Sequence, residues 1–98
     1  MYMKIHEKGG QKVVAACDAD LRGMVLGEGG MCLDLARYSS FYKGEMCTGE
    51  ELLAAIPSAS SINLVGKKSV SAGLRSGLFS QGEARYINGI PHIQVYRV

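Results

Sequence analysis

The fold is decided by residues 48–77, TGEELLAAIPSASSINLVGKKSVSAGLRSG, because this stretch carries both predicted helices. Thr48 and Glu51 form a capping box: the threonine hydroxyl can accept the backbone N–H of Glu51, while the glutamate carboxylate reaches back to the backbone N–H of the cap. The first helix therefore begins at this box, and its apolar residues fall on one side. Pro57 and the Ser/Ala run after it mark the end of this helix.

The second helix is predicted to begin at Asn63 and to end at Gly77. Asparagine is favoured at helix N-termini, and glycine suits the left-handed position that follows a helix. Val70 and Leu74 lie one helical turn apart and provide the apolar side that packs on the rest of the domain.

Extended segments are predicted on both sides of the helices. Residues 2–6 alternate between apolar and polar, and Gly9-Gly10 turns the chain into a second strand, which predicts an N-terminal hairpin. Residues 31–35 alternate as a third strand, and Asn88-Gly89 is the turn of a C-terminal hairpin. Strands, two helices and then strands predict a single α+β domain over residues 1–98, with two helices packed on one side of a mainly antiparallel sheet.

The composition, with 47% hydrophobic and 20% charged residues in 98, is that of one globular domain. Its apolar runs, such as Val13–Cys17, are too short to cross a bilayer or to form the core of a signal peptide, so we expect a cytoplasmic protein and no membrane partner. Cys17, Cys32 and Cys47 lie beside apolar residues without metal-ligand spacing. We therefore expect reduced thiols packed as small hydrophobic side chains, and neither a metal nor a cofactor.

The net charge of +2 is divided unevenly along the chain. Residues 1–51 hold six basic and eight acidic side chains, whereas residues 52–98 hold five basic and one acidic. A basic second half favours an anionic partner, and RNA or a ribonucleoprotein is the partner we expect. The alternative is a modest basic face of the kind that is also common on proteins that bind no nucleic acid.

Two lysines, Lys67 and Lys68, stand near the start of the predicted second helix, where the helix dipole disfavours cations. A bound phosphate would offset this cost, which makes Asn63, Gly66, Lys67 and Lys68 candidate phosphate ligands. The alternative is two solvated lysines that precede a later helix start.

The segment from Arg37 to Gly44 gathers three of the seven aromatic residues between cations. The rings of Tyr38 and Tyr42 are candidates for stacking on unpaired bases, with Lys43 beside a phosphate. Alternatively, some of these rings turn inward and anchor the loop.

A polar sheet face is the second candidate surface. If the first and last strands are neighbours, polar and aromatic side chains of both gather on the face that points away from the apolar positions, and His92 and Gln94 lie among them. Such a face suits RNA, a partner protein or plain exposure to solvent. For His92, a structural hydrogen bond is the alternative to a catalytic role.

Four short segments, read in order, resemble those of a known family. They are Asp18-x-x-Leu21-x-Gly23, Phe41-Tyr42-x-Gly44, Asn63-Leu64-Val65-Gly66 and Gly89-Ile90-Pro91-His92-x-Gln94, which closes on Val98. This set resembles a family of small archaeal proteins known as domain of unknown function number four hundred and twenty-four, over nearly the whole chain. The resemblance implies an archaeal, cytoplasmic protein and carries no activity with it. The second helix departs from the family pattern, since serine, glycine and lysine stand where members carry more acidic residues.

Three classes of function remain open. The leading hypothesis is a non-catalytic RNA-binding or ribonucleoprotein- or translation-associated module that uses the candidate phosphate and stacking residues. The second is a small enzyme or ligand-binding protein with a pocket around His92, completed by Gln94 or a cysteine and by a dimer interface, because one protomer of this size encloses little. The third is a protein-interaction adaptor that uses the aromatic segment. The sequence contains no recognised catalytic motif, so the enzyme class depends on His92.

Overall fold

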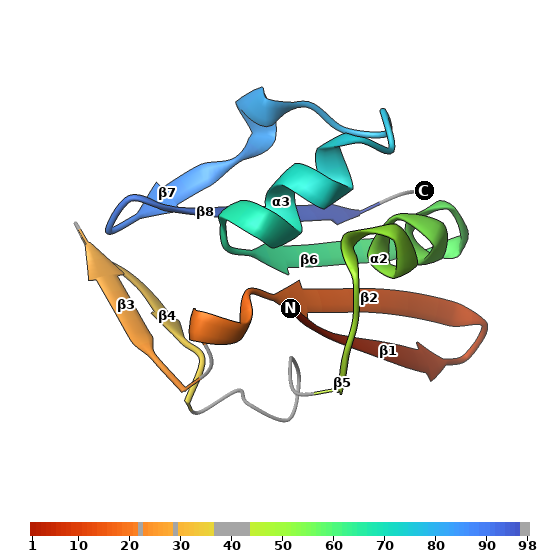
Figure 1. Cartoon of the computed structure of the whole chain (residues 1–98), viewed down its shortest axis with the longest axis horizontal. Coiled ribbons are helices and arrows are strands. Elements are labelled where there is room, and N and C mark those ends of the chain that lie inside the picture. The colour runs from red at the N-terminus through yellow and green to blue at the C-terminus, as the bar shows by residue number, and fades with distance from the viewer. Residues whose placement is uncertain (22, 29, 37–43, 97–98) are drawn as a thin grey trace.

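A six-stranded sheet organises the fold (Figure 1). The computed structural model of the chain describes residues 1–21, 23–28, 30–36 and 44–96. Neighbouring strands are antiparallel except for the central pair, β2 and β6, which is parallel. The strand order is β5 (Glu45–Met46), β1 (Tyr2–Lys8), β2 (Gln11–Cys17), β6 (Ser61–Val65), β8 (Ile90–Tyr96) and β7 (Arg85–Ile87).

Two helices cover one face of this sheet, as the sequence predicts, and they lie side by side in Figure 1. A separate hairpin, made of β3 and β4, lies against one end of the other face. Three short 3₁₀ turns connect the elements. The bounds are α2 (Gly49–Ala55), α3 (Lys67–Leu74), β3 (Val25–Glu28), β4 (Met31–Asp34), η1 (Ala19–Leu21), η2 (Ile56–Ser58) and η3 (Gln81–Glu83). Among the residues that the structure describes, none of these helices has the length and the apolar character to cross a membrane.

The local signals at both ends of the chain are confirmed. β1 and β2 form the N-terminal hairpin, with Gly9 and Gly10 at positive φ in its turn. β7 and β8 form the C-terminal hairpin, and Asn88 and Gly89 adopt the positive φ that a tight hairpin turn requires. Residues 97 and 98 lie outside the described part of the chain.

The capping box at the start of α2 is also confirmed. The backbone N–H of Glu51 donates to Thr48 Oγ1 over 3.1 Å, and the N–H of Thr48 donates to Glu51 Oε1 over 3.0 Å. Leu52 and Ile56 are fully buried on its sheet-facing side, and Pro57 lies in the 3₁₀ turn that ends the helix.

The predicted start of the second helix is wrong. Asn63 lies in the middle of β6 and caps no helix; α3 begins at Lys67, behind the N-cap residue Gly66. β6 is a central strand whose residues are mostly buried, so tertiary packing of its apolar run overrides the capping preference of asparagine. The helix also ends earlier than predicted, at Leu74, and Gly77 takes its left-handed conformation in the turn beyond.

The third predicted strand is partly right. β4 covers Met31–Asp34, but its partner β3 was not predicted, and Leu35 lies beyond the strand as a buried residue. The two strands pair only with each other and form a two-stranded sheet.

The expected adjacency of the first and last strands is wrong. β2 and β6 separate β1 from β8. The reason is the parallel pairing of β2 with β6, which inserts the segment between the two helices into the centre of the sheet. The polar side chains of β1 and those of β8 therefore lie on the same face of the sheet, but the two strands β2 and β6 stand between them.

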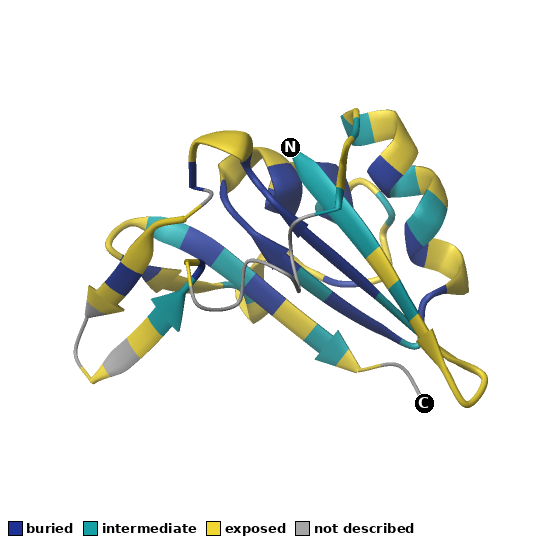
Figure 2. Cartoon of the chain, turned by 90° about the horizontal axis from the view of Figure 1, so that it is seen from below, coloured by how far each residue is buried: buried dark blue, intermediate teal, exposed yellow. Residues whose placement is uncertain are grey.

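Alternation along the strands divides the core in two. The side that faces the helices holds the larger cluster, which includes Val14, Ile62, Leu64 and Ile93. The opposite side holds a smaller cluster beneath the β3–β4 hairpin: Ala15, Cys17, Leu21, Leu35 and Val65. Figure 2 shows the buried positions concentrated along the central strands, whereas the β1–β2 turn is exposed.

The three cysteines are free, but they are not equally packed. Cys17 is buried as expected and Cys47 is half-buried, whereas Cys32 on β4 is exposed. The expectation of a packed thiol is therefore wrong at Cys32, since β4 turns that residue away from the smaller cluster.

Candidate functional site

A groove lies on the face of the sheet that the helices leave open. We call it the open-face groove; it has a volume of about 490 Å³, in the range of small-molecule sites. The β3–β4 hairpin covers only one end of this face, so strands β7 and β8 are left as the floor beside it. The groove is lined by Cys32, Leu33, Glu83, Arg85, Ile87, His92, Gln94 and Tyr96.

Strand β8 supplies three polar side chains to the groove. Because alternate residues of a strand point to opposite faces, His92, Gln94 and Tyr96 share one face, while Ile93 and Val95 pack with the helices. Tyr96 is 76% exposed, which is high for an aromatic side chain on a sheet.

Strand β7 and the turn before it add two charged groups. Arg85 is the register partner of His92, so both side chains stand on the same face of the hairpin. Glu83 ends η3, and its Oε1 accepts the backbone N–H of Ser80 over 3.2 Å.

The wall of the groove is held in place by a contact between the two sheets. The backbone N–H of Gly27 on β3 donates to Asn88 Oδ1 in the β7–β8 turn over 3.0 Å. This bond fixes the β3–β4 hairpin relative to β8, and it places Cys32 and Leu33 of β4 at the edge of the groove.

His92 is held by a neighbour from the central strand. Its Nε2–H donates to Asn63 Oδ1 over 3.0 Å. Burial, and secondly the positive charge of Arg85, lower the pKa of His92 below its ordinary value, so the ring is neutral at pH 7. A neutral, half-buried imidazole beside an open groove can accept or donate a hydrogen bond to a ligand.

The start of α3, in contrast, is closed by the chain itself. Asp18, which is 6% exposed, accepts the backbone N–H groups of Lys68 at 3.0 Å and of Ser69 at 2.8 Å. The buried hydroxyl of Ser69 donates to the same carboxylate over 2.8 Å. An internal anion therefore occupies the helix terminus that the sequence suggested for phosphate.

Gly66 fits this arrangement because it has no side chain. Its φ of 108° and ψ of 156° belong to a region that is essentially restricted to glycine. A Cβ atom at this position would also overlap the Asp18 carboxylate. The glycine therefore lets the carboxylate approach the helix terminus.

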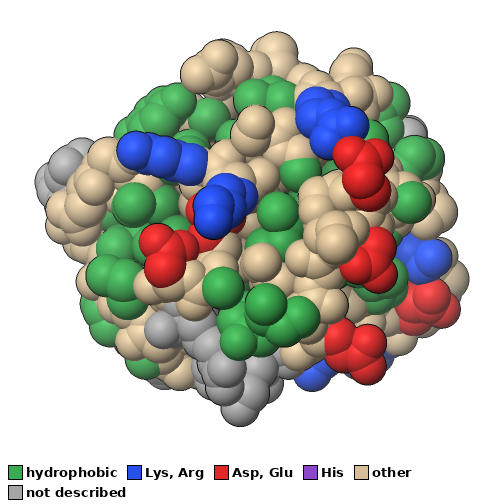
Figure 3. Space-filling model, viewed as in Figure 1, with side chains coloured by type: hydrophobic (Ala, Val, Ile, Leu, Met, Phe, Trp, Pro, Cys, Tyr) green, Lys and Arg blue, Asp and Glu red, His purple; other side chains and the backbone are tan. Residues whose placement is uncertain are grey.

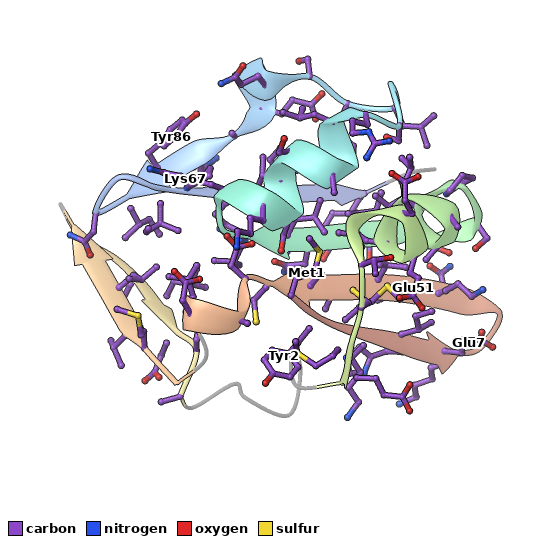
Figure 4. The ribbon with its side chains drawn as sticks, viewed as in Figure 1. Met1, Tyr2, Glu7, Glu51, Lys67 and Tyr86 are labelled. Atoms are coloured by element: carbon purple, nitrogen blue, oxygen red, sulfur yellow. The ribbon has the colours of Figure 1, made fainter. Side chains whose placement is uncertain are left out.

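Lys67 and Lys68 are both exposed in the first turn of α3, which Figure 4 shows for Lys67. Asp18 explains why two cations are tolerated there, since its carboxylate is bound at the same helix terminus and brings a negative charge to it. Figure 3 shows that basic and acidic side chains are interspersed on this face of the molecule. Arg75, the C-cap residue just after α3, pairs with Glu50 of α2 over 2.7 Å.

The structure thus brings together only part of the residues singled out from the sequence. Asn63, His92 and Gln94 meet at the open-face groove, and Gly66, Lys67 and Lys68 lie apart from it at the start of α3. Tyr38, Tyr42 and Lys43 lie outside the described residues.

Sequence reasoning missed two charged groove residues, Glu83 and Arg85, and did not distinguish Cys32 from the other two cysteines as the one that lines the groove. A signal existed for Arg85, because counting outward from the two-residue turn at Asn88-Gly89 places it opposite His92. No sequence signal placed Cys32 at the groove, since its position depends on how the β3–β4 hairpin packs against the larger sheet. In the described part of the chain, no group of three or more His, Cys, Asp or Glu is placed to hold a metal ion.

Comparison with known proteins gives two matches. The model of a family described as "Protein of unknown function (DUF424)" matches residues 6–98. The crystal structure of an uncharacterized conserved protein from Methanopyrus kandleri superposes with a TM-score of 0.80 at 27% sequence identity, covering 99% of this chain and 90% of that one. A search of curated proteins gives no match.

Proposed function

We propose that this chain, which belongs to the DUF424 family of proteins of unknown function, is a non-catalytic RNA-binding module that holds an unpaired nucleotide in the open-face groove. The observation that carries the proposal is the exposed Tyr96 ring in line with Gln94 and His92, with Arg85 on the neighbouring strand. We place the module in the cytoplasm of an archaeon, in association with RNA or a ribonucleoprotein; the free thiols are those of a protein in a reducing compartment.

Each of these side chains offers one kind of contact that unpaired RNA needs. An exposed tyrosine ring on a sheet can stack on a base, and Gln94 and His92 offer hydrogen bonds to base edges. Arg85 offers a fixed positive charge to a phosphate. A groove of about 490 Å³ is large enough for a nucleotide and small enough to select for one.

The proposal favours the groove over the start of α3 because polar groups in the groove are open to a ligand. At α3, by contrast, Asp18 already accepts the hydrogen bonds that a phosphate would accept. Phosphate contacts by Lys67 and Lys68 stay a separate prediction.

Fluorescence anisotropy with a labelled single-stranded RNA of ten nucleotides and mixed sequence tests the proposal. We expect Tyr96→Ala to weaken binding about tenfold, since base–aromatic stacking is worth about 1–3 kcal/mol. Tyr86→Ala is the matched control, because Tyr86 is a half-exposed tyrosine whose register partner, Pro91, points away from the groove. No binding at tens of micromolar RNA, or equal loss in both variants, would contradict the proposal.

Salt dependence gives a second measure of the same site. Arg85→Ala should reduce the slope of log affinity against log salt by about one, as expected for one phosphate contact. An unchanged slope would remove Arg85 from the phosphate site.

A second candidate function uses the same groove for a small ligand or its chemistry. The observation in its favour is that His92 is half-buried, bonded to a side chain and adjacent to a cavity, with the exposed Cys32 on the wall. Native mass spectrometry of the protein purified from its own cells separates the two: a bound small molecule favours the second candidate, and bound RNA fragments favour the first.

A further inference from the structure

We infer that Asn63 and His92 make the open-face groove selective for bases that carry an exocyclic amino group over uracil. This inference rests on the proposed RNA binding and names the specificity of that same site. Asn63 acts here as a positioning residue, and His92 as the residue that contacts the base.

The hydrogen bond between the two side chains fixes where the imidazole proton lies. An amide oxygen can only accept, so the 3.0 Å contact with Asn63 Oδ1 places the hydrogen on His92 Nε2. In the neutral ring, Nδ1 then carries a lone pair and can only accept a hydrogen bond.

That lone pair is within reach of the groove. Every buried side-chain nitrogen or oxygen in the described ranges has a hydrogen-bond partner. The hydrogen bond of the His92 ring runs through Nε2, and Nδ1 is not among fully buried atoms that lack a partner. His92 itself lines the groove.

The setting keeps the ring in this state. Asn63 lies on the central strand β6, in register with Gln94 of β8, so the pair is built on two hydrogen-bonded strands rather than on a loop. Arg85 stands beside His92 and opposes its protonation. The groove therefore presents an acceptor at this position, and the carboxylate of Glu83 lines the same groove.

Cytosine and uracil differ at two neighbouring positions of the edge that Nδ1 could meet. Both are pyrimidines of similar shape, but cytosine carries an N4 amino donor where uracil carries the O4 acceptor, and N3 is an acceptor in cytosine and an N–H donor in uracil. The inferred preference therefore places Nδ1 opposite position 4, where O4 of uracil would leave the acceptor without a hydrogen and cost it a hydrogen bond.

The test compares the binding of ten-nucleotide oligocytidine and oligouridine by anisotropy at pH 7.5. We expect the wild-type protein to bind oligocytidine about threefold to tenfold more tightly, as one neutral hydrogen bond provides. His92→Leu removes both ring nitrogens and should bring the ratio to about one, with little change in the affinity for oligouridine.

Asn63→Asp tests the positioning role with a side chain of the same shape. A carboxylate at this position favours the protonated ring, in which Nδ1–H becomes a donor, so the preference should move toward oligouridine. A ratio that is unchanged in this variant would overturn the role of Asn63. Thermal unfolding checks that each variant is folded, and His92→Leu still decides the question if Asn63→Asp does not fold.

The remaining outcomes are distinct for the two proposals. Equal binding of both oligonucleotides by the wild-type protein, or tighter binding of oligouridine, would overturn the inference and leave RNA binding in place. Binding of neither would overturn the proposed function, and the inference with it.

Discussion

The start of α3 and the open-face groove both gather polar and charged side chains, but the hydrogen-bond partners of these side chains differ between the two regions. At α3, the carboxylate of Asp18 accepts hydrogen bonds from Lys68 and Ser69, and the cluster is buried. In the groove, Tyr96 and Gln94 are exposed, and His92 is bonded through one ring nitrogen. A cluster whose hydrogen bonds are complete serves the fold, whereas one with open groups is available to a ligand.

Among the variants that test this comparison, Gly66→Ala should cause the largest loss in the free energy of unfolding. The new side chain would require a backbone conformation restricted to glycine and would overlap Asp18, so we expect a loss of at least about 3 kcal/mol in the free energy of unfolding. Urea unfolding measures it. Gly77→Ala is the matched control: Gly77 also has positive φ but has open space around it, and its substitution should cost only about 1 kcal/mol.

Asp18→Ala should come second, at about 2–3 kcal/mol. It removes the cap of α3 and leaves the buried hydroxyl and N–H of Ser69 without their acceptor. Asp20→Ala, an exposed neighbour in η1, should change the free energy of unfolding by less than about 0.5 kcal/mol. Similar losses in the two variants would show that the α3 cluster is not the closed structural site described above.

His92, which lines the groove, should make the stability of the protein depend on pH. Because the pKa of His92 is lowered from 6.5 in the folded protein, the unfolded chain takes up a proton more readily than the folded one as the pH falls below about 6.5. Stability should therefore be unaffected by His92 above pH 7 and should fall toward pH 5.5. Urea unfolding of the wild type and His92→Leu at pH 7.5 and 5.5 isolates this contribution, and an identical pH dependence in both would refute it.

The smallest effect is expected from the double variant Lys67→Glu, Lys68→Glu. If these lysines contacted phosphate, the salt slope of RNA binding would fall by about two. Because Asp18 already occupies the helix terminus, we expect a change of less than one, with Arg85→Ala as the comparison. A fall of two would move the binding site from the groove to α3.

Local signals in the sequence predicted the parts of the fold that depend on near neighbours. The Thr48–Glu51 box and the turns at Gly9-Gly10 and Asn88-Gly89 each act within a few residues, and each appears in the structure where expected. The α+β class and the two helices on one face follow from the order of these elements.

The parts that could not be predicted depend on distant partners. Asn63 is a good helix cap by itself, and only its place between β2 and β8 makes it a strand residue that holds His92. Asp18 and Ser69 are 51 residues apart, so nothing near either one marks the cap that they form. The lysine pair indicated a negative charge at the helix start, and the structure has the Asp18 carboxylate there; phosphate contacts by the two lysines stay a prediction.

The parallel pairing of β2 with β6 has a consequence for how the chain reaches this structure. One end of this pairing is held by the backbone N–H of Lys12, which donates to Ser60 Oγ across a separation of 48 residues. Closing a loop of this length costs roughly 3 kcal/mol of chain entropy before the pairing offsets it. The two terminal hairpins can each form early from local contacts, but the centre of the sheet can join them only late. We therefore expect a high contact order to make docking of the hairpins through β6 the rate-limiting step of folding.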